Sequence, residues 1–122
     1  MLKLLIIDDE DGIVREVKDF FEEEGYRVLS ADTGEEGKQL IVKEFPDLVI
    51  LDLKLPDISG IEVLRMLRKS FPNSKVIVDT GYVDQGLMDQ ATELGCNVFL
   101  SKPFNLIKLK EEVDRILSPQ SF

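Results

Sequence analysis

The chain reads Leu48-Val49-Ile50-Leu51-Asp52-Leu53-Lys54-Leu55-Pro56-Asp57-Ile58-Ser59-Gly60 near its middle, and this stretch decides the fold. The apolar run before Asp52 indicates a short strand that is buried on both faces. A carboxylate at the end of such a strand faces a crevice, pairs with a cation or binds a metal, because burying it alone is expensive. Ser59 and Glu62 have the form of a capping box, which indicates that a helix follows. At this point the simpler alternative, that Asp52 only ends the strand, stays open.

The rest of the chain repeats this alternation of strand and helix. Apolar runs predict further strands at residues 2–7, 26–31, 75–78 and 97–100. Residues at helical spacing predict helices at about 11–24, 34–45, 61–71, 84–94 and 106–116. The pattern predicts a single α/β domain, a doubly wound (βα)5 fold with helices on both faces of a five-stranded parallel sheet. The flavodoxin-like strand order 2-1-3-4-5 is the common one for such sheets. This domain spans residues 1–122, and residues 118–122 are expected to form a frayed tail.

Composition narrows the class of protein. A chain of 122 residues is long enough for one domain with one core. Its net charge of -9 gives no electrostatic reason to bind nucleic acid or an anionic membrane surface. No segment has the length of a membrane span, and the apolar run at 4–7 is too short for a signal peptide. The single cysteine, Cys96, excludes an internal disulfide and is expected to be a small buried residue. We therefore expect a cytoplasmic protein.

Polar residues gather where the predicted strands end. They are Asp8 and Asp9 after the first strand, Asp52 after the third, Thr80 after the fourth and Lys102 after the fifth. In the order 2-1-3-4-5, the first and third strands are neighbours where the winding reverses. Ligands of such sheets bind there, beyond the carboxyl ends of the strands.

These residue types suit metal-assisted phosphoryl transfer. Carboxylates in one crevice repel each other unless they are protonated or bridged by a cation, and Mg²⁺ prefers such oxygen ligands. Asp8, Asp9 and Asp52 supply acids, and a backbone carbonyl in the loop after Asp52 adds a further ligand. The chain has no histidine, which argues against a zinc site of the usual kind. A carboxylate can also act as the nucleophile, with Lys102 and Thr80 supplying positive charge and a hydroxyl donor. Lys102 as an ordinary surface lysine and Thr80 as a turn residue remain the simpler readings.

With these residues in order, the chain resembles a receiver domain of a two-component response regulator over essentially its whole length. The matching positions are Asp8-Asp9, Asp52, Leu55-Pro56-Asp57, Ser59-Gly60, Thr80-Gly81 and Lys102-Pro103. The resemblance implies that Asp52 accepts a phosphoryl group from a sensor histidine kinase or a phosphotransfer protein. Such a domain catalyses its own phosphorylation and dephosphorylation and is not a turnover enzyme. It also implies that the bond between Lys102 and Pro103 is cis.

The resemblance further implies a role for each site residue. Asp9 and Asp52 ligate Mg²⁺ directly, together with the backbone carbonyl of Lys54, while Asp8 acts mainly through water. Lys102 contacts the phosphoryl group. Thr80 and Phe99 form a switch that changes the surface built from residues 84–94, 97–100 and 106–116. A downstream output domain, a target protein or a second copy in a homodimer docks on that surface, and no output domain is expected within the 122 residues.

Asp79 departs from the family pattern, which usually has an apolar or small residue before the switch threonine. Its carboxylate either lies near the site and weakens phosphate binding or faces outward. Lys54 and Tyr82 stand at positions that tune the lifetime of the phosphate in this family.

The sequence also bears on three functions other than that of a receiver domain. A flavodoxin-like nucleotide binder is disfavoured because the acidic run at residues 8–11 repels phosphate. An aspartate-nucleophile phosphatase requires a second acid where Lys54 stands. A receiver-like interaction module that does not take phosphate remains the alternative, because Asp79 could weaken phosphate binding.

Overall fold

The computed structural model describes residues 1–81 and 84–118, and its five strands form one parallel sheet in the order β2-β1-β3-β4-β5. The strands are β1 (Lys3–Ile7), β2 (Arg27–Ala31), β3 (Leu48–Asp52), β4 (Lys75–Thr80) and β5 (Val98–Ser101). The helices are α1 (Asp11–Glu23), α2 (Gly34–Glu44), α3 (Gly60–Ser70), α4 (Gln85–Glu93) and α5 (Leu106–Leu117). The predicted fold class and strand order are therefore confirmed. Tyr82 and residues 119–122 of the expected tail lie outside the described residues.

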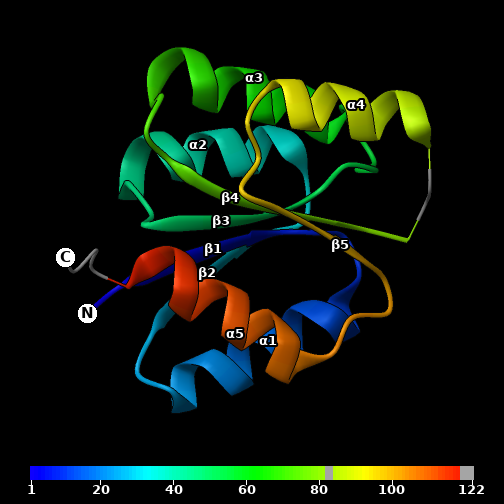
Figure 1. Cartoon of the computed structure of the whole chain (residues 1–122). Coiled ribbons are helices and arrows are strands. Elements are labelled where there is room, and N and C mark those ends of the chain that lie inside the picture. Colours follow the sequence, from blue (N-terminus) through cyan, green and yellow to red (C-terminus); the bar gives the residue numbers. More distant parts are fainter. Residues whose placement is uncertain (82–83, 119–122) are drawn as a thin grey trace, which may run out of the picture.

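Helices cover both faces of the sheet, with α2, α3 and α4 on one side and α1 and α5 on the other (Figure 1). Successive strand residues point to opposite faces, so each central strand supplies both cores. Leu5, Val49 and Val78 pack under α2, α3 and α4, whereas Leu4, Ile50 and Ile77 pack under α1 and α5. Burial on both faces explains why these strands read as continuous apolar runs.

Side-chain caps begin four of the five helices at or near the predicted residues. Thr33 accepts a hydrogen bond from the backbone N–H of Glu36, and Asp84 and Asn105 cap α4 and α5 in the same way. Ser59 caps α3 through the N–H of Ile61. The first helix differs from these four, because α1 begins at Asp11 and its N-cap residue, Glu10, makes no side-chain hydrogen bond.

Strand β4 is longer than its apolar run. The prediction ended this strand at Val78, but Asp79 pairs in register with Asp52 of β3, and Thr80 pairs with Ser101 of β5. Because the neighbouring strands β3 and β5 continue the backbone pairing, Asp79 and Thr80 stay in β4. This extension places Asp79 inside the sheet.

Two smaller observations bear on the expectations from composition. Among the described residues no helix combines the length and the apolar character needed to cross a membrane. Cys96 is half-buried, against the core cluster under α2, α3 and α4, and so is less buried than expected.

Candidate functional site

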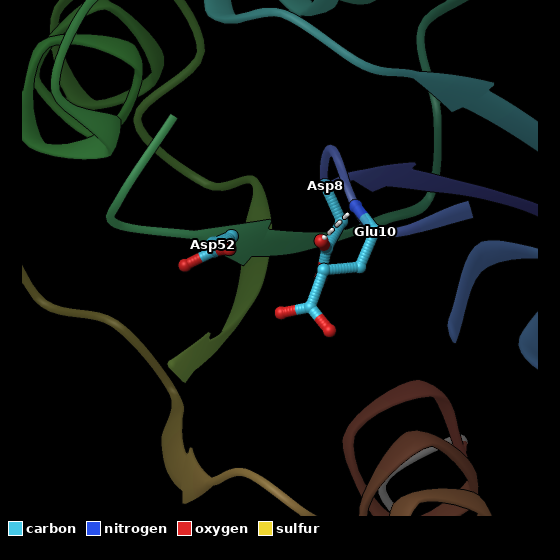
Figure 2. Close-up of side chains that lie close together, drawn as sticks. All are labelled: Asp8, Glu10 and Asp52. Atoms are coloured by element: carbon cyan, nitrogen blue, oxygen red, sulfur yellow. Dashed lines mark hydrogen bonds between the residues drawn. The ribbon is translucent and has the colours of Figure 1, made fainter. Parts of the chain in front are cut away.

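The predicted site residues meet at the carboxyl edge of the sheet. Asp8 follows β1, and Asp52 ends β3, its neighbour. Both carboxylates are buried, with relative exposures of 1% for Asp8 and 4% for Asp52. The alternation of side chains puts Asp52 on the same face as Ile50, above α1 and α5. Figure 2 shows Asp8, Glu10 and Asp52 close together at this edge.

The ammonium group of Lys102 lies among these acids. Its Nζ is 2.8 Å from Asp8 Oδ2, 3.0 Å from Glu10 Oε1 and 3.1 Å from Asp52 Oδ2. Only 7% of its side chain is exposed, so Lys102 is not an ordinary surface lysine. Burial by itself lowers the pKa of Lys102, but the hydrogen bonds to the three acids more than offset this effect and raise its pKa above the usual value.

The Asp52 carboxylate has a distinct environment for each oxygen. Oδ1 accepts a hydrogen bond of 3.0 Å from the backbone N–H of Lys54, and Oδ2 faces Lys102. Burial raises the pKa of Asp52, while these two hydrogen bonds oppose the rise. The carboxylate borders a surface cavity of about 420 Å³. The cavity is lined by Asp9, Glu10, Asp52, Lys54, Leu55, Pro56, Thr80, Gly81 and Lys102.

Glu10 is the acid that the sequence analysis did not single out. Carboxylate oxygens of Asp8, Glu10 and Asp52 all lie within 4.8 Å of one another. The backbone N–H of Glu10 donates to Asp8 Oδ1 at 2.9 Å, and the Glu10 side chain lies beside that of Asp8 (Figure 2). Asp9 is exposed and does not belong to this group of three, although it lines the cavity. An all-oxygen donor set of this kind fits Mg²⁺.

Asp79 faces inward. Its exposure is 0%, and neither carboxylate oxygen has a hydrogen-bond partner within residues 1–81 and 84–118. Burial, with the charges of Asp8 and Asp52, raises the pKa of Asp79 to about 8 against the opposing charge of Lys102. The alternative that Asp79 faces outward is therefore wrong.

Thr80 and Phe99 belong to the other face of the sheet. Thr80 is buried, and because side chains alternate along a strand it points to the same face as Val78, two residues before it. Val78 pairs in register with Phe99 of β5. Phe99 packs, partly buried, against the core cluster under α2, α3 and α4. The backbone N–H of Lys102 donates to the carbonyl of Thr80 at 2.9 Å, and the bond from Lys102 to Pro103 is cis, as expected. Thr80 and Phe99 are thus on one side of the sheet and the acids are on the other, although Thr80 also lines the cavity beside Asp52.

Comparison with known proteins gives a consistent result. The chain matches the family model of the response regulator receiver domain over residues 4–114. It is 34% identical over 119 residues to sporulation initiation phosphotransferase F of Bacillus subtilis, a match that covers 98% of this chain and 96% of that protein. It is also 34% identical to the transcriptional regulatory protein PhoP of Bacillus subtilis, covering 94% of this chain but only 48% of the relative.

Solved structures agree in fold. A CheY-like receiver domain from Methanospirillum hungatei superposes with a TM-score of 0.92 at 35% identity, covering 94% of this chain and 92% of that one. The response regulator protein TrrA from Thermotoga maritima, solved in complex with Mg²⁺ and BeF, has a TM-score of 0.86 at 36% identity, with coverages of 96% and 100%. Receiver domains accept a phosphoryl group on an aspartate from a kinase. The chain belongs to the family of response regulator receiver domains in two-component signalling.

Proposed function

We propose that Asp52 is the phosphoacceptor and that the cavity beside it takes the phosphoryl donor together with Mg²⁺. One observation carries this proposal: Asp52 is the carboxylate at which the acid group, the Lys102 ammonium and the open cavity meet. Sensor histidine kinases or phosphotransfer proteins would be the donors, which locates this role in the cytoplasm. The domain catalyses its own phosphorylation and dephosphorylation and does not turn over a substrate.

The transfer follows from the positions of these groups. An oxygen of Asp52 attacks the phosphorus atom, the P–N bond to the donor imidazole breaks, and the imidazole leaves with that electron pair. Lys102 lies within hydrogen-bond distance of Asp52 Oδ2 and offsets charge on the phosphoryl oxygens. A bound Mg²⁺ supplies further positive charge to the same oxygens.

Asp9, rather than Glu10, supplies the second carboxylate to the ion in this proposal. Glu10 already shares the ammonium of Lys102, so its charge is partly neutralised, whereas Asp52 is kept as a ligand, despite its own contact with Lys102, because it is the proposed phosphoacceptor. Asp9 lines the cavity without belonging to that group. Asp52 and the carbonyl of Lys54 complete the direct ligands, and Asp8 acts through water.

Asp9→Ala is expected to abolish Mg²⁺ binding at concentrations that saturate the unsubstituted domain, because it removes a direct charged ligand. Glu10→Gln is the matched control and should weaken binding only a few-fold. A Mg²⁺ titration followed by amide NMR shifts measures both. Equal Mg²⁺ affinity in Asp9→Ala and the parent domain would remove Asp9 from the ligand set, and loss of binding in Glu10→Gln alone would put Glu10 in its place.

The proposed function is tested directly with acetyl phosphate. With Mg²⁺ present, intact-mass measurement should show one added phosphoryl group, and hydroxylamine should remove it, as expected for an acyl phosphate. The buried carboxyl group of Asp79 beside Asp52 favours a second candidate, a receiver-like interaction module that takes no phosphate. A domain that binds Mg²⁺ but stays unmodified would establish that candidate instead.

The output would come from Thr80 and Phe99. An aspartyl phosphate brings about two negative charges and three oxygens that need donors. In our proposal the Thr80 hydroxyl turns toward it, and the ring of Phe99 moves into the vacated space on the same face. The α4-β5-α5 surface then changes, and a target protein, an output domain or a second copy docks there. Beryllofluoride should therefore shift amide NMR signals throughout residues 87–109, and changes confined to the loops around Asp52 would contradict the switch.

A further inference from the structure

The loop that connects β3 to α3 is closed tightly at its base. The backbone N–H of Gly60 donates to the carbonyl of Leu53 at 2.9 Å, and Lys54 and Ser59 form an isolated antiparallel bridge. Gly60 lies so close to β3 that a Cβ atom there would come within 2.3 Å of the Asp52 carbonyl oxygen. This geometry fixes where the loop leaves and rejoins the core, but it does not fix the tip.

The tip of the loop is fastened to a different element, the N-terminus of α2. Asp57 Oδ1 accepts from the backbone N–H of Gly34 at 2.8 Å, and its Oδ2 accepts from that of Glu35 at 3.0 Å. These N–H groups have no partner inside the helix, and the positive end of the helix dipole favours a carboxylate there. The hydrogen bonds from Glu35 and Gly34 hold the pKa of Asp57 below its usual value.

Close packing accompanies these hydrogen bonds. A Cβ atom at Gly34 would lie 2.4 Å from Ile58 Cγ1, so the glycine lets the next residue of the loop rest directly on α2. Thr33 caps the third N–H of the same helix, that of Glu36, at 3.1 Å. Asp57 is therefore not the only cap of α2. Unlike Thr33, it also attaches the loop after β3 to this helix.

We propose that Asp57 is a positioning residue: Asp57 lies between the bridged residues Lys54 and Ser59, so by tying the loop tip to α2 it steadies that bridge and holds the Lys54 carbonyl where a divalent cation beside Asp52 needs it. This inference rests on the proposed function, in which that carbonyl is a ligand. A neutral carbonyl binds well only when it is held in place, and groups that orient metal ligands commonly change affinity by about 10- to 100-fold when they are removed. The N-terminus of α2 thus becomes part of the metal site without touching the ion.

The test compares Mg²⁺ affinity in Asp57→Ala, Asp57→Asn and Thr33→Val by NMR titration of the whole domain. Asp57→Ala should weaken binding by about tenfold or more, and Asp57→Asn, which keeps one acceptor oxygen, should fall between it and the parent. Thr33→Val is the matched control, because it removes a cap from the same helix and leaves the loop attached. A residue that only stabilised α2 would give the same result in Asp57→Ala and Thr33→Val.

A second readout is independent of phosphorylation. If loop position and ion binding are coupled, the coupling is reciprocal, so Mg²⁺ must slow hydrogen exchange at the amides of Gly34 and Glu35. The effect should vanish in Asp57→Ala. It would show that the ion reaches α2 through this carboxylate.

The outcomes separate the two proposals. Unchanged Mg²⁺ affinity in Asp57→Ala, with affinity lost in Asp9→Ala, overturns the positioning role alone. Equal weakening in Thr33→Val and Asp57→Ala also overturns it. Mg²⁺ affinity that survives in both Asp9→Ala and an Asp52 variant overturns the proposed metal site itself.

Discussion

Asp52→Asn is expected to abolish phosphorylation by acetyl phosphate, taking the modified fraction from its full value to none. The amide oxygen is a poor nucleophile, and the substitution also removes charge from the proposed Mg²⁺ site. The fold should survive, because the amide oxygen can still accept from the N–H of Lys54 and the repulsion between Asp52 and Asp8 is removed. A failure of folding is therefore not the reason for the expected loss.

Intact-mass analysis with and without Mg²⁺ measures this result, and circular dichroism reports the fold. Asp19→Asn is the matched control, because Asp19 is an exposed aspartate on α1, about two helical turns beyond Asp11. It should be modified like the parent. A hydroxylamine-sensitive adduct that persists in Asp52→Asn would assign the phosphoryl group to another carboxylate, which peptide mapping would locate.

Asp79→Val is expected to stabilise the domain by several kcal/mol near neutral pH. The wild-type carboxyl is fully buried without a hydrogen-bond partner in the described part of the chain, and its pKa is raised to about 8. Each unit of pKa shift corresponds to about 1.4 kcal/mol, so the rise from 3.8 to about 8 opposes folding by roughly 4 kcal/mol at pH 7 and by roughly 6 kcal/mol well above pH 8. Valine fits the apolar, β-branched character of a central strand.

The pH dependence gives this prediction its sign. The pKa of Asp79 is higher in the folded state than in the unfolded one, so the folded protein binds more protons between the two values. The contribution of Asp79 to the free energy of unfolding is most favourable below about pH 4, falls as pH rises, and levels off above about pH 8. The gain in Asp79→Val should therefore grow over that range.

Urea unfolding at several pH values measures the difference. Asp79→Asn is the informative control, since it removes the ionisation but still buries a polar group, and it should gain less than valine. A constant difference between wild type and Asp79→Val across the pH range would mean that the buried carboxyl is not the cause.

Much of the architecture was readable from the sequence because its determinants are local. Apolar runs and helical spacing mark the strands and helices, and a capping residue such as Ser59 marks where a helix begins. Short connections between strands and helices require a parallel sheet. A parallel sheet brings the carboxyl ends of its strands to one edge, so the gathering of Asp8, Asp52 and Lys102 followed from their positions in the chain.

What the sequence left open depended on neighbours that are distant along the chain. The turn after Asp8 decided that Glu10 joins the acid group around Lys102, and nothing in the acidic run distinguished it from Asp9. Pairing with β3 and β5 kept Asp79 in the sheet and buried its carboxylate. The hydrogen bond that the Gly34 N–H of α2 donates to Asp57 joins residues 23 positions apart. Local patterns determine which elements form, whereas tertiary packing alone decides which polar atoms meet, because each partner is supplied by another element.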